Sequence, residues 1–224
     1  MKINYVSLDK QSKDQSQKLL KIFKDCLNKS IFVNGDEVSK FEKKVSKKCG
    51  TKYAVALNSG TDALTLALKL LGIKKGDEVI TPPNSFISST SSIIHLGAKP
   101  VFVDTAKDQN IDPDKIEKKI TKKTKAIYVI HYAGNACDII KLKKIAKANK
   151  LYLIEDAAHA YSAKFKSNYL GTIGDIGVFS FHETKNIVSG QGGCISINNS
   201  NLIKRANFIL DKGTNRIEFI NNYK

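Results

Sequence analysis

Short apolar segments alternate along this chain with longer segments in which apolar residues recur every three or four positions. The short segments are rich in β-branched and aromatic residues and predict strands at 53–57, 78–81, 100–103, 126–130 and 151–154. The longer segments predict helices at 61–71, 86–96, 113–120 and 138–149, and Asp112-Pro113 suits the entry of the third. Two further strands, 176–181 and 193–198, precede a helix at 202–210. This alternation predicts an α/β fold, a three-layer α/β/α sandwich with a mostly parallel central sheet.

Two more helices are predicted before the first strand, at 15–28 and 37–48. Each has apolar residues along one side. Such a side can pack on the sheet or on another subunit, and the pattern leaves both arrangements open.

The formal net charge of +16 allows two interpretations, a nucleic-acid partner or a lysine-rich surface on an enzyme with anionic ligands. The lysines are spread along the predicted helices with few arginines or aromatic residues between them, which favours the second interpretation and no nucleic-acid partner. No apolar run approaches the ~20 residues of a membrane helix, and residues 1–8 lack a secretory signal, so we expect a cytoplasmic protein without a membrane partner. Four scattered cysteines predict no metal site.

An acid and a lysine stand in an order that suits pyridoxal phosphate. Glu155-Asp156 ends a predicted strand, where ligands collect in open α/β sheets, and Lys185 follows the strand at 176–181. A carboxylate can keep a pyridine ring protonated, and an amine can form an imine with an aldehyde. His159 can face the same ring. Taken singly, these residues are also typical of a loop acid, a solvated lysine and a structural histidine.

Asn58-Ser-Gly-Thr-Asp62 lies between the first strand and a helix, where free backbone N–H groups favour an anion. The same residues can simply cap the helix, and capping is the commoner role. Ser180 can complete a phosphate site or be a buried serine. Gly190-Gln-Gly-Gly193 forms a turn near the lysine.

Several blocks in a fixed order resemble one family. They are Asn34–Glu42, Asn58–Leu64, Gly76–Ile80, Gly97–Asp104, Glu155–His159 and Phe179–His182. On these blocks the chain resembles the large domain of the DegT/DnrJ/EryC1/StrS aminotransferases, which bind pyridoxal 5'-phosphate and have the fold of aspartate aminotransferase (type I).

The resemblance implies a role for each matching residue. Lys185 would be the Schiff-base lysine, Asp156 the partner of the pyridine nitrogen and His159 a neighbour of the phenolic oxygen. The other implied cofactor-binding residues are Ser59, Gly60, Thr61 and Ser180 at the phosphate, Phe86 against the ring face, and Asn186 beside the lysine.

The implied reaction moves an amino group from an amino-acid donor, glutamate in most of the family, to a keto sugar linked to a nucleotide diphosphate. Its products serve cell-surface polysaccharide or glycan biosynthesis, and the family's usual assembly implies a homodimer. Two segments, 182–186 and 212–216, are similar to the enzymes that make dTDP-4-amino-4,6-dideoxygalactose. Related sugar dehydratases carry histidine at the lysine position, so Lys185 argues against that activity.

Family members continue through a second, smaller domain that this sequence lacks. We therefore expect an N-terminal helical segment at 1–34, a cofactor-binding large domain at 35–212, and at 213–224 the start of the segment leading to the small domain. That domain carries a residue that reaches the neighbouring subunit's phosphate site. The alternative function is a non-catalytic fragment, or one half of a split aminotransferase.

Overall fold

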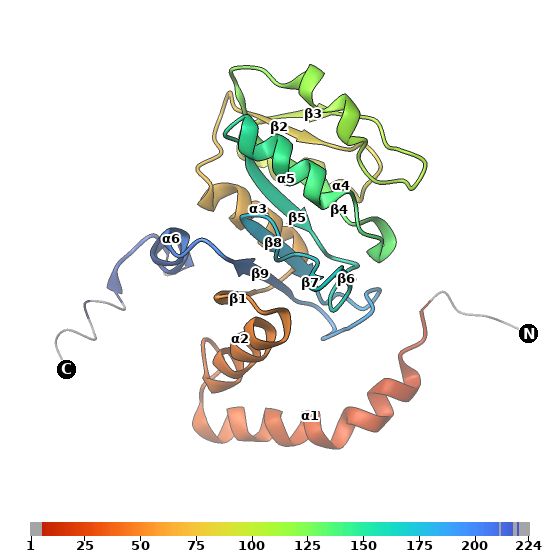
Figure 1. The fold of residues 1–224 in the computed structure, drawn as a ribbon. Helices are drawn as coiled ribbons and strands as arrows, with labels where there is room; N and C mark the ends of the chain where they lie inside the picture. Colours follow the sequence, from red (N-terminus) through yellow and green to blue (C-terminus); the bar gives the residue numbers. More distant parts are fainter. Residues whose placement is uncertain (1–5, 211, 217–218, 220–224) are drawn as a thin grey trace, which may run out of the picture.

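A seven-stranded sheet forms the centre of the computed structural model, which describes residues 6–210, 212–216 and 219 (Figure 1). The strands lie in the order β1-β9-β8-β5-β4-β2-β3. From β8 to β3 all neighbours are parallel, whereas β9 is antiparallel to both β8 and β1. The strands are β1 (Tyr53–Leu57), β2 (Glu78–Thr81), β3 (Lys99–Phe102), β4 (Thr124–Ile130), β5 (Tyr152–Asp156), β8 (Ile176–Ser180) and β9 (Gly193–Ile197). The predicted mostly parallel sheet is confirmed.

Helices cover both faces of this sheet, as the sandwich requires (Figure 1). On one face, α3 (Gly60–Leu70), α4 (Ile87–His95) and α6 (Asn201–Leu210) enclose a core to which α3 contributes Leu64 and Leu68 and the sheet contributes Val79. On the other face, α2 (Asp36–Cys49) and α5 (Ile139–Ala148) enclose a second core. Each helix buries the side on which its apolar residues recur.

The two N-terminal helices differ in what they bury. In α2, Val45 and Cys49 are buried against the sheet. The helix α1 (Asp9–Lys29) has no buried residue and runs across the end of the molecule, away from the sheet (Figure 1). Its apolar side chains, among them Leu20 and Phe23, are exposed.

The prediction of a helix at 113–120 is wrong. Two short 3-10 helices, η1 (Pro113–Lys115) and η2 (Glu117–Lys119), occupy that segment. Asp112 does cap the first of them, accepting from the N–H of Asp114 at 3.0 Å. The segment inserts Ile116 into the core, and Ile120 returns to extended backbone before β4. Eight residues with one fully buried anchor do not form two regular turns with a continuous apolar stripe.

The structure also contains short elements that periodicity did not predict. A hairpin of β6 (Lys164–Phe165) and β7 (Asn168–Tyr169) precedes β8, and η3 (Tyr132–Gly134) follows β4. Of the predicted C-terminal segment 213–224, residues 217–218 and 220–224 lie outside the described part of the chain. Within the described part, no helix has the length and apolar character needed to cross a membrane.

Candidate active site

Three strands bring the predicted residues to one edge of the sheet. Asp156 ends β5, Ser180 ends β8, and Ser59 follows β1. Because β9 is antiparallel to both β8 and β1, the carboxyl ends of β1 and β8 point the same way as that of β5. This edge is where open α/β sheets bind ligands.

Lys185 and His159 meet directly. The Lys185 Nζ lies 2.8 Å from the His159 Nε2. Burial lowers the pKa of Lys185, and the carboxylate of Asp156 opposes that shift. Burial, and then the charge of Lys185, lower the pKa of His159. A larger fraction of the Lys185 amine is therefore uncharged at a given pH than for an ordinary lysine, and the uncharged amine is the nucleophile.

Asp156 is buried and accepts hydrogen bonds on both carboxylate oxygens. Oδ1 accepts from the N–H of Ala158 at 3.0 Å, and Oδ2 accepts from the Tyr128 hydroxyl at 3.0 Å and the Ser89 hydroxyl at 3.3 Å. Neither Tyr128 nor Ser89 is among the site residues predicted from the sequence. A usable signal existed for Tyr128, since its hydroxyl lies inside an otherwise apolar strand and must find a partner there.

The N-terminus of α3 adjoins Ser180. Ser59 caps this helix, accepting from the N–H of Asp62 at 3.0 Å, so the capping role is confirmed. The N–H groups of Gly60 and Thr61 have no partner within the helix, because the first turn has no preceding carbonyls. A Cβ on Gly60 would lie 2.9 Å from the Ser180 Cβ and 3.1 Å from its Oγ. The absence of a side chain at Gly60 keeps the serine hydroxyl against the helix start.

Gly193 is packed against the same helix start from β9. A Cβ there would overlap the carbonyl oxygen of Ser59 and would lie 2.8 Å from the Gly60 nitrogen. The contact is with backbone on both sides, so no side-chain movement could relieve it. The hydroxyl of Thr61 is turned toward α4, 2.8 Å from the Ser88 Oγ.

The contacts of two further predicted residues, Phe86 and Asn186, lie with their own segments. Phe86 stands at the N-cap position of α4 with its side chain 74% exposed. The Asn186 amide donates to the carbonyl of Tyr161 at 3.1 Å. Asn186 thus fixes the loop after the lysine to the segment after His159.

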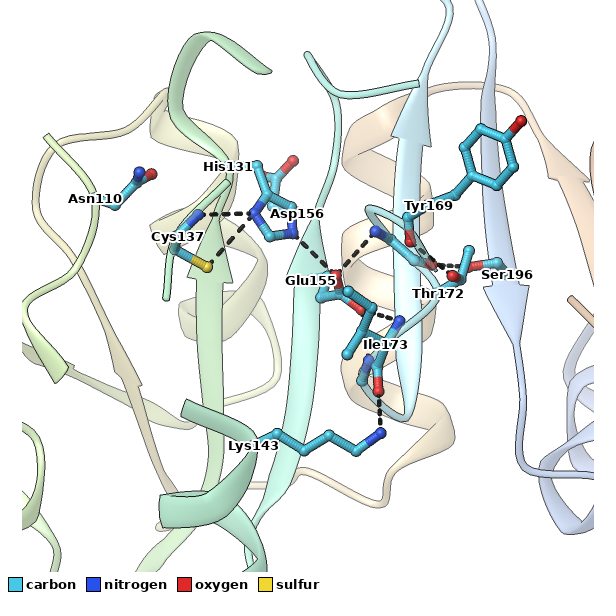
Figure 2. Close-up of polar contacts among 12 residues, drawn as sticks. Asn110, His131, Cys137, Lys143, Glu155, Asp156, Tyr169, Thr172, Ile173 and Ser196 are labelled. Atoms are coloured by element: carbon cyan, nitrogen blue, oxygen red, sulfur yellow. Dashed lines mark hydrogen bonds and ion pairs between the residues drawn. The ribbon is translucent and has the colours of Figure 1, made fainter. Parts of the chain in front are cut away.

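Glu155 has a different place from its neighbour Asp156, because adjacent residues of a strand face opposite sides of the sheet. Its buried carboxylate accepts from the His131 Nε2 and the Gly171 N–H, both at 2.9 Å (Figure 2). It also accepts from the N–H groups of Ile173 at 2.6 Å and Gly174 at 2.5 Å. Glu155 therefore joins β5 to the 171–174 turn and contributes nothing to the lysine side of the sheet.

The tautomer of His131 follows from its neighbours. Its Nδ1 accepts from the N–H of Cys137 at 3.3 Å, so its Nε2 carries the proton that goes to Glu155 (Figure 2). Burial raises the pKa of the Cys137 thiol, which keeps the sulfur protonated. Within the described ranges, no group of three or more histidine, cysteine or acidic side chains is placed to hold a metal ion.

A sequence comparison finds that the model of the DegT/DnrJ/EryC1/StrS aminotransferase family matches residues 13–224. GDP-perosamine synthase of Escherichia coli O157:H7 is 42% identical over 183 residues, which is 81% of this chain and 50% of that protein. The chain spans about half the length of the curated relatives it matches.

Two solved structures with the same fold contain a reaction intermediate or a bound cofactor. S. venezuelae DesV in complex with a ketimine intermediate superposes with a TM-score of 0.90 at 32% identity, covering 95% of this chain and 58% of that one. NtdA from Bacillus subtilis with bound cofactor PMP superposes with a TM-score of 0.84 at 34% identity, covering 92% of this chain and 47% of that one.

Proposed function

The chain belongs to the DegT/DnrJ/EryC1/StrS aminotransferase family, and from that membership we propose that it is a pyridoxal-phosphate-dependent nucleotide-sugar aminotransferase. It would move an amino group from an amino acid, glutamate in the first instance, to a keto sugar linked to a nucleotide diphosphate. The name of the E. coli relative, GDP-perosamine synthase, supports a nucleotide-linked amino sugar as product. The contact of Lys185 with His159 near Asp156 is the observation that carries the proposal.

The residues at the sheet edge fit the three parts of this cofactor. The helix start at Gly60 and Thr61 offers N–H groups to a phosphate. Ser180, which packs closely against Gly60, offers its hydroxyl beside them. Asp156 offers a buried negative charge to the ring nitrogen. Lys185 offers an amine with a lowered pKa to the aldehyde. PMP, bound by the relative NtdA, is the aminated form of the same cofactor.

Bound there, the cofactor would supply an electron sink for carbanion chemistry. The chain's own residues would do the rest. Lys185 would hold the cofactor covalently and, once released by the donor, would take the proton from the donor's α-carbon. His159, 2.8 Å from the same amine, would fix its direction. Asp156 would keep the ring nitrogen protonated.

Within the family, segments 182–186 and 212–216 support the subgroup that aminates carbon 4 of a dTDP-linked 4-keto-6-deoxy sugar. We propose that substrate as the first to assay. We further propose that the protein acts as a homodimer, the assembly that its family resemblance implies.

The test uses the visible absorbance of the lysine-bound cofactor. Pyridoxal phosphate added to the purified protein should give this band, and glutamate should remove it. Lys185→Ala should show no band, whereas Lys118→Ala, an exposed lysine on η2, should behave like the unmodified protein. Absence of the band from the unmodified protein at saturating cofactor would refute the proposal.

A further inference from the structure

Asp156 is held by donors that reach it from other elements. The two hydroxyls on Oδ2 come from Tyr128 on β4 and Ser89 on α4, while the donor on Oδ1 is the N–H of Ala158, two residues further along the chain. The carboxylate is thus fixed from the sheet, from the covering helix and from its own loop. A buried carboxylate bound on both oxygens has little freedom to rotate.

The register of the sheet explains how Tyr128 reaches Asp156. Tyr128 pairs with Ile154 and Ile130 pairs with Asp156, so Tyr128 and Asp156 face the same side as diagonal neighbours. Only a long side chain spans a diagonal pair. The Tyr128 ring is completely buried, and its hydroxyl meets the Asp156 Oδ2 at 3.0 Å. An aliphatic residue at this position would fill the core without offering a donor.

The direction of both hydroxyl bonds is fixed. Burial, and then the negative charge of Asp156, raise the pKa of the Tyr128 hydroxyl well above its ordinary value, so the hydroxyl keeps its proton and donates. Ser89 donates to Asp156, and therefore its oxygen accepts from the Ser85 hydroxyl at 2.6 Å. A line of hydroxyls from the loop before α4 thus points its protons toward the carboxylate.

We propose that Tyr128 and Ser89 are positioning residues that hold the Asp156 carboxylate in the one orientation in which it meets the ring nitrogen of pyridoxal phosphate. This inference rests on the proposed function. Tyr128 makes the shorter bond, so its hydroxyl carries the larger share of the effect.

Tyr128→Phe removes the hydroxyl and keeps the ring. Titration with pyridoxal phosphate, followed by the visible band, should show a dissociation constant about tenfold weaker, the scale of one hydrogen bond to a charged group. Ser89→Ala should weaken binding less. Tyr152→Phe is the matched control, because Tyr152 begins β5 at the opposite end from Asp156 and is exposed.

A double-mutant cycle separates orientation from packing. In an Asp156→Asn background, Tyr128→Phe should change cofactor affinity by less than roughly twofold, because the charged acceptor that the hydroxyl orients is gone. An equal loss in both backgrounds, or no loss in the single variant, would overturn the inference. Thermal unfolding of the cofactor-free variants shows whether each remains folded.

A cofactor-free measurement distinguishes failure of this inference from failure of the proposed function. The buried Tyr128 hydroxyl proton should give a slowly exchanging NMR resonance that disappears in Tyr128→Phe and moves in Asp156→Asn. A resonance unaffected by Asp156→Asn would overturn the inference even if the cofactor binds. A resonance that moves, in a protein that binds no pyridoxal phosphate, would support the hydroxyl–carboxylate pairing and refute the proposed function.

Discussion

Single side chains set the charge balance around Lys185. Asp156 is close enough to raise the pKa of both Lys185 and His159, while burial lowers the pKa of each and is the larger influence. Lys185 therefore has a lowered pKa and, at the same time, a carboxylate close by. That combination is typical of amines that must react with an aldehyde and later carry a proton.

Asp156→Asn should lower the pKa of Lys185 further. The carboxylate stabilises the ammonium form, so its removal shifts the equilibrium toward the neutral amine. The reaction of Lys185 with trinitrobenzenesulfonate in cofactor-free protein should then reach its midpoint at a lower pH, read by mass spectrometry of the labelled peptide. Glu117→Gln, an exposed acid on η2, should leave the midpoint unchanged. A midpoint that stays or rises in Asp156→Asn would contradict the electrostatic role.

At the scale of elements, the close approach of β9 to the start of α3 shapes the phosphate end of the site. Gly193 touches the backbone of Ser59 and Gly60, and Gly60 in turn touches Ser180. Because Gly193 and Gly60 have no side chains, the start of β9, the start of α3 and the end of β8 come into direct contact. An atom added at Gly193 would meet only backbone, so it would have to move an element rather than a side chain.

Gly193→Ala should therefore destabilise the fold by roughly 1–3 kcal/mol, the usual cost of overpacking a core. Denaturant unfolding of cofactor-free protein measures it. Gly192→Ala is the matched control, because its new Cβ would meet the Ser189 Oγ at 2.7 Å, the movable end of a side chain. Equal stability of the two variants would show that α3 and β9 can separate without cost.

The sequence predicted best the elements whose pattern is complete within themselves. The strands at 53–57 and 78–81 match β1 and β2 because polar residues bound short apolar runs on both sides. The prediction for segment 113–120 failed because the form of this segment depends on burying Ile116 in the core rather than on its own periodicity. The hairpin β6–β7 has two residues in each strand, too few for any period.

Part of the site was also predictable, and part was not. Motif order placed Lys185, His159 and Asp156 together, and the structure brings the first two into contact. The hydroxyls of Tyr128 and Ser89 needed the register of β4 and β5 and the packing of α4, which no local pattern carries. Strand alternation alone would have separated Glu155 from Asp156.

For the whole molecule, the notable element is α1, a helix of 21 residues that buries none of them. Leu20 is 61% exposed and Phe23 is 59% exposed, on a helix without a single buried residue. A contiguous apolar surface of this kind binds other apolar surface.

Leu20→Lys combined with Phe23→Glu should therefore reduce both the fluorescence of a bound hydrophobic dye and concentration-dependent association in sedimentation. Lys21→Gln, on the same helix, should change neither. Unchanged dye binding in the double variant would place the apolar surface elsewhere.

The sheet order has a consequence for how the chain reaches this structure. Within the described sheet, β1 pairs only with β9, although residues 58–192 separate the two strands in the sequence. On a ribosome, the first strand to be made would have to wait until residue 197 had emerged before it could join the sheet. Long-range pairing of this kind slows folding, because the loop must close before any contact rewards it. The helix start at Gly60, which follows β1, would then acquire its final place among the last parts of the molecule.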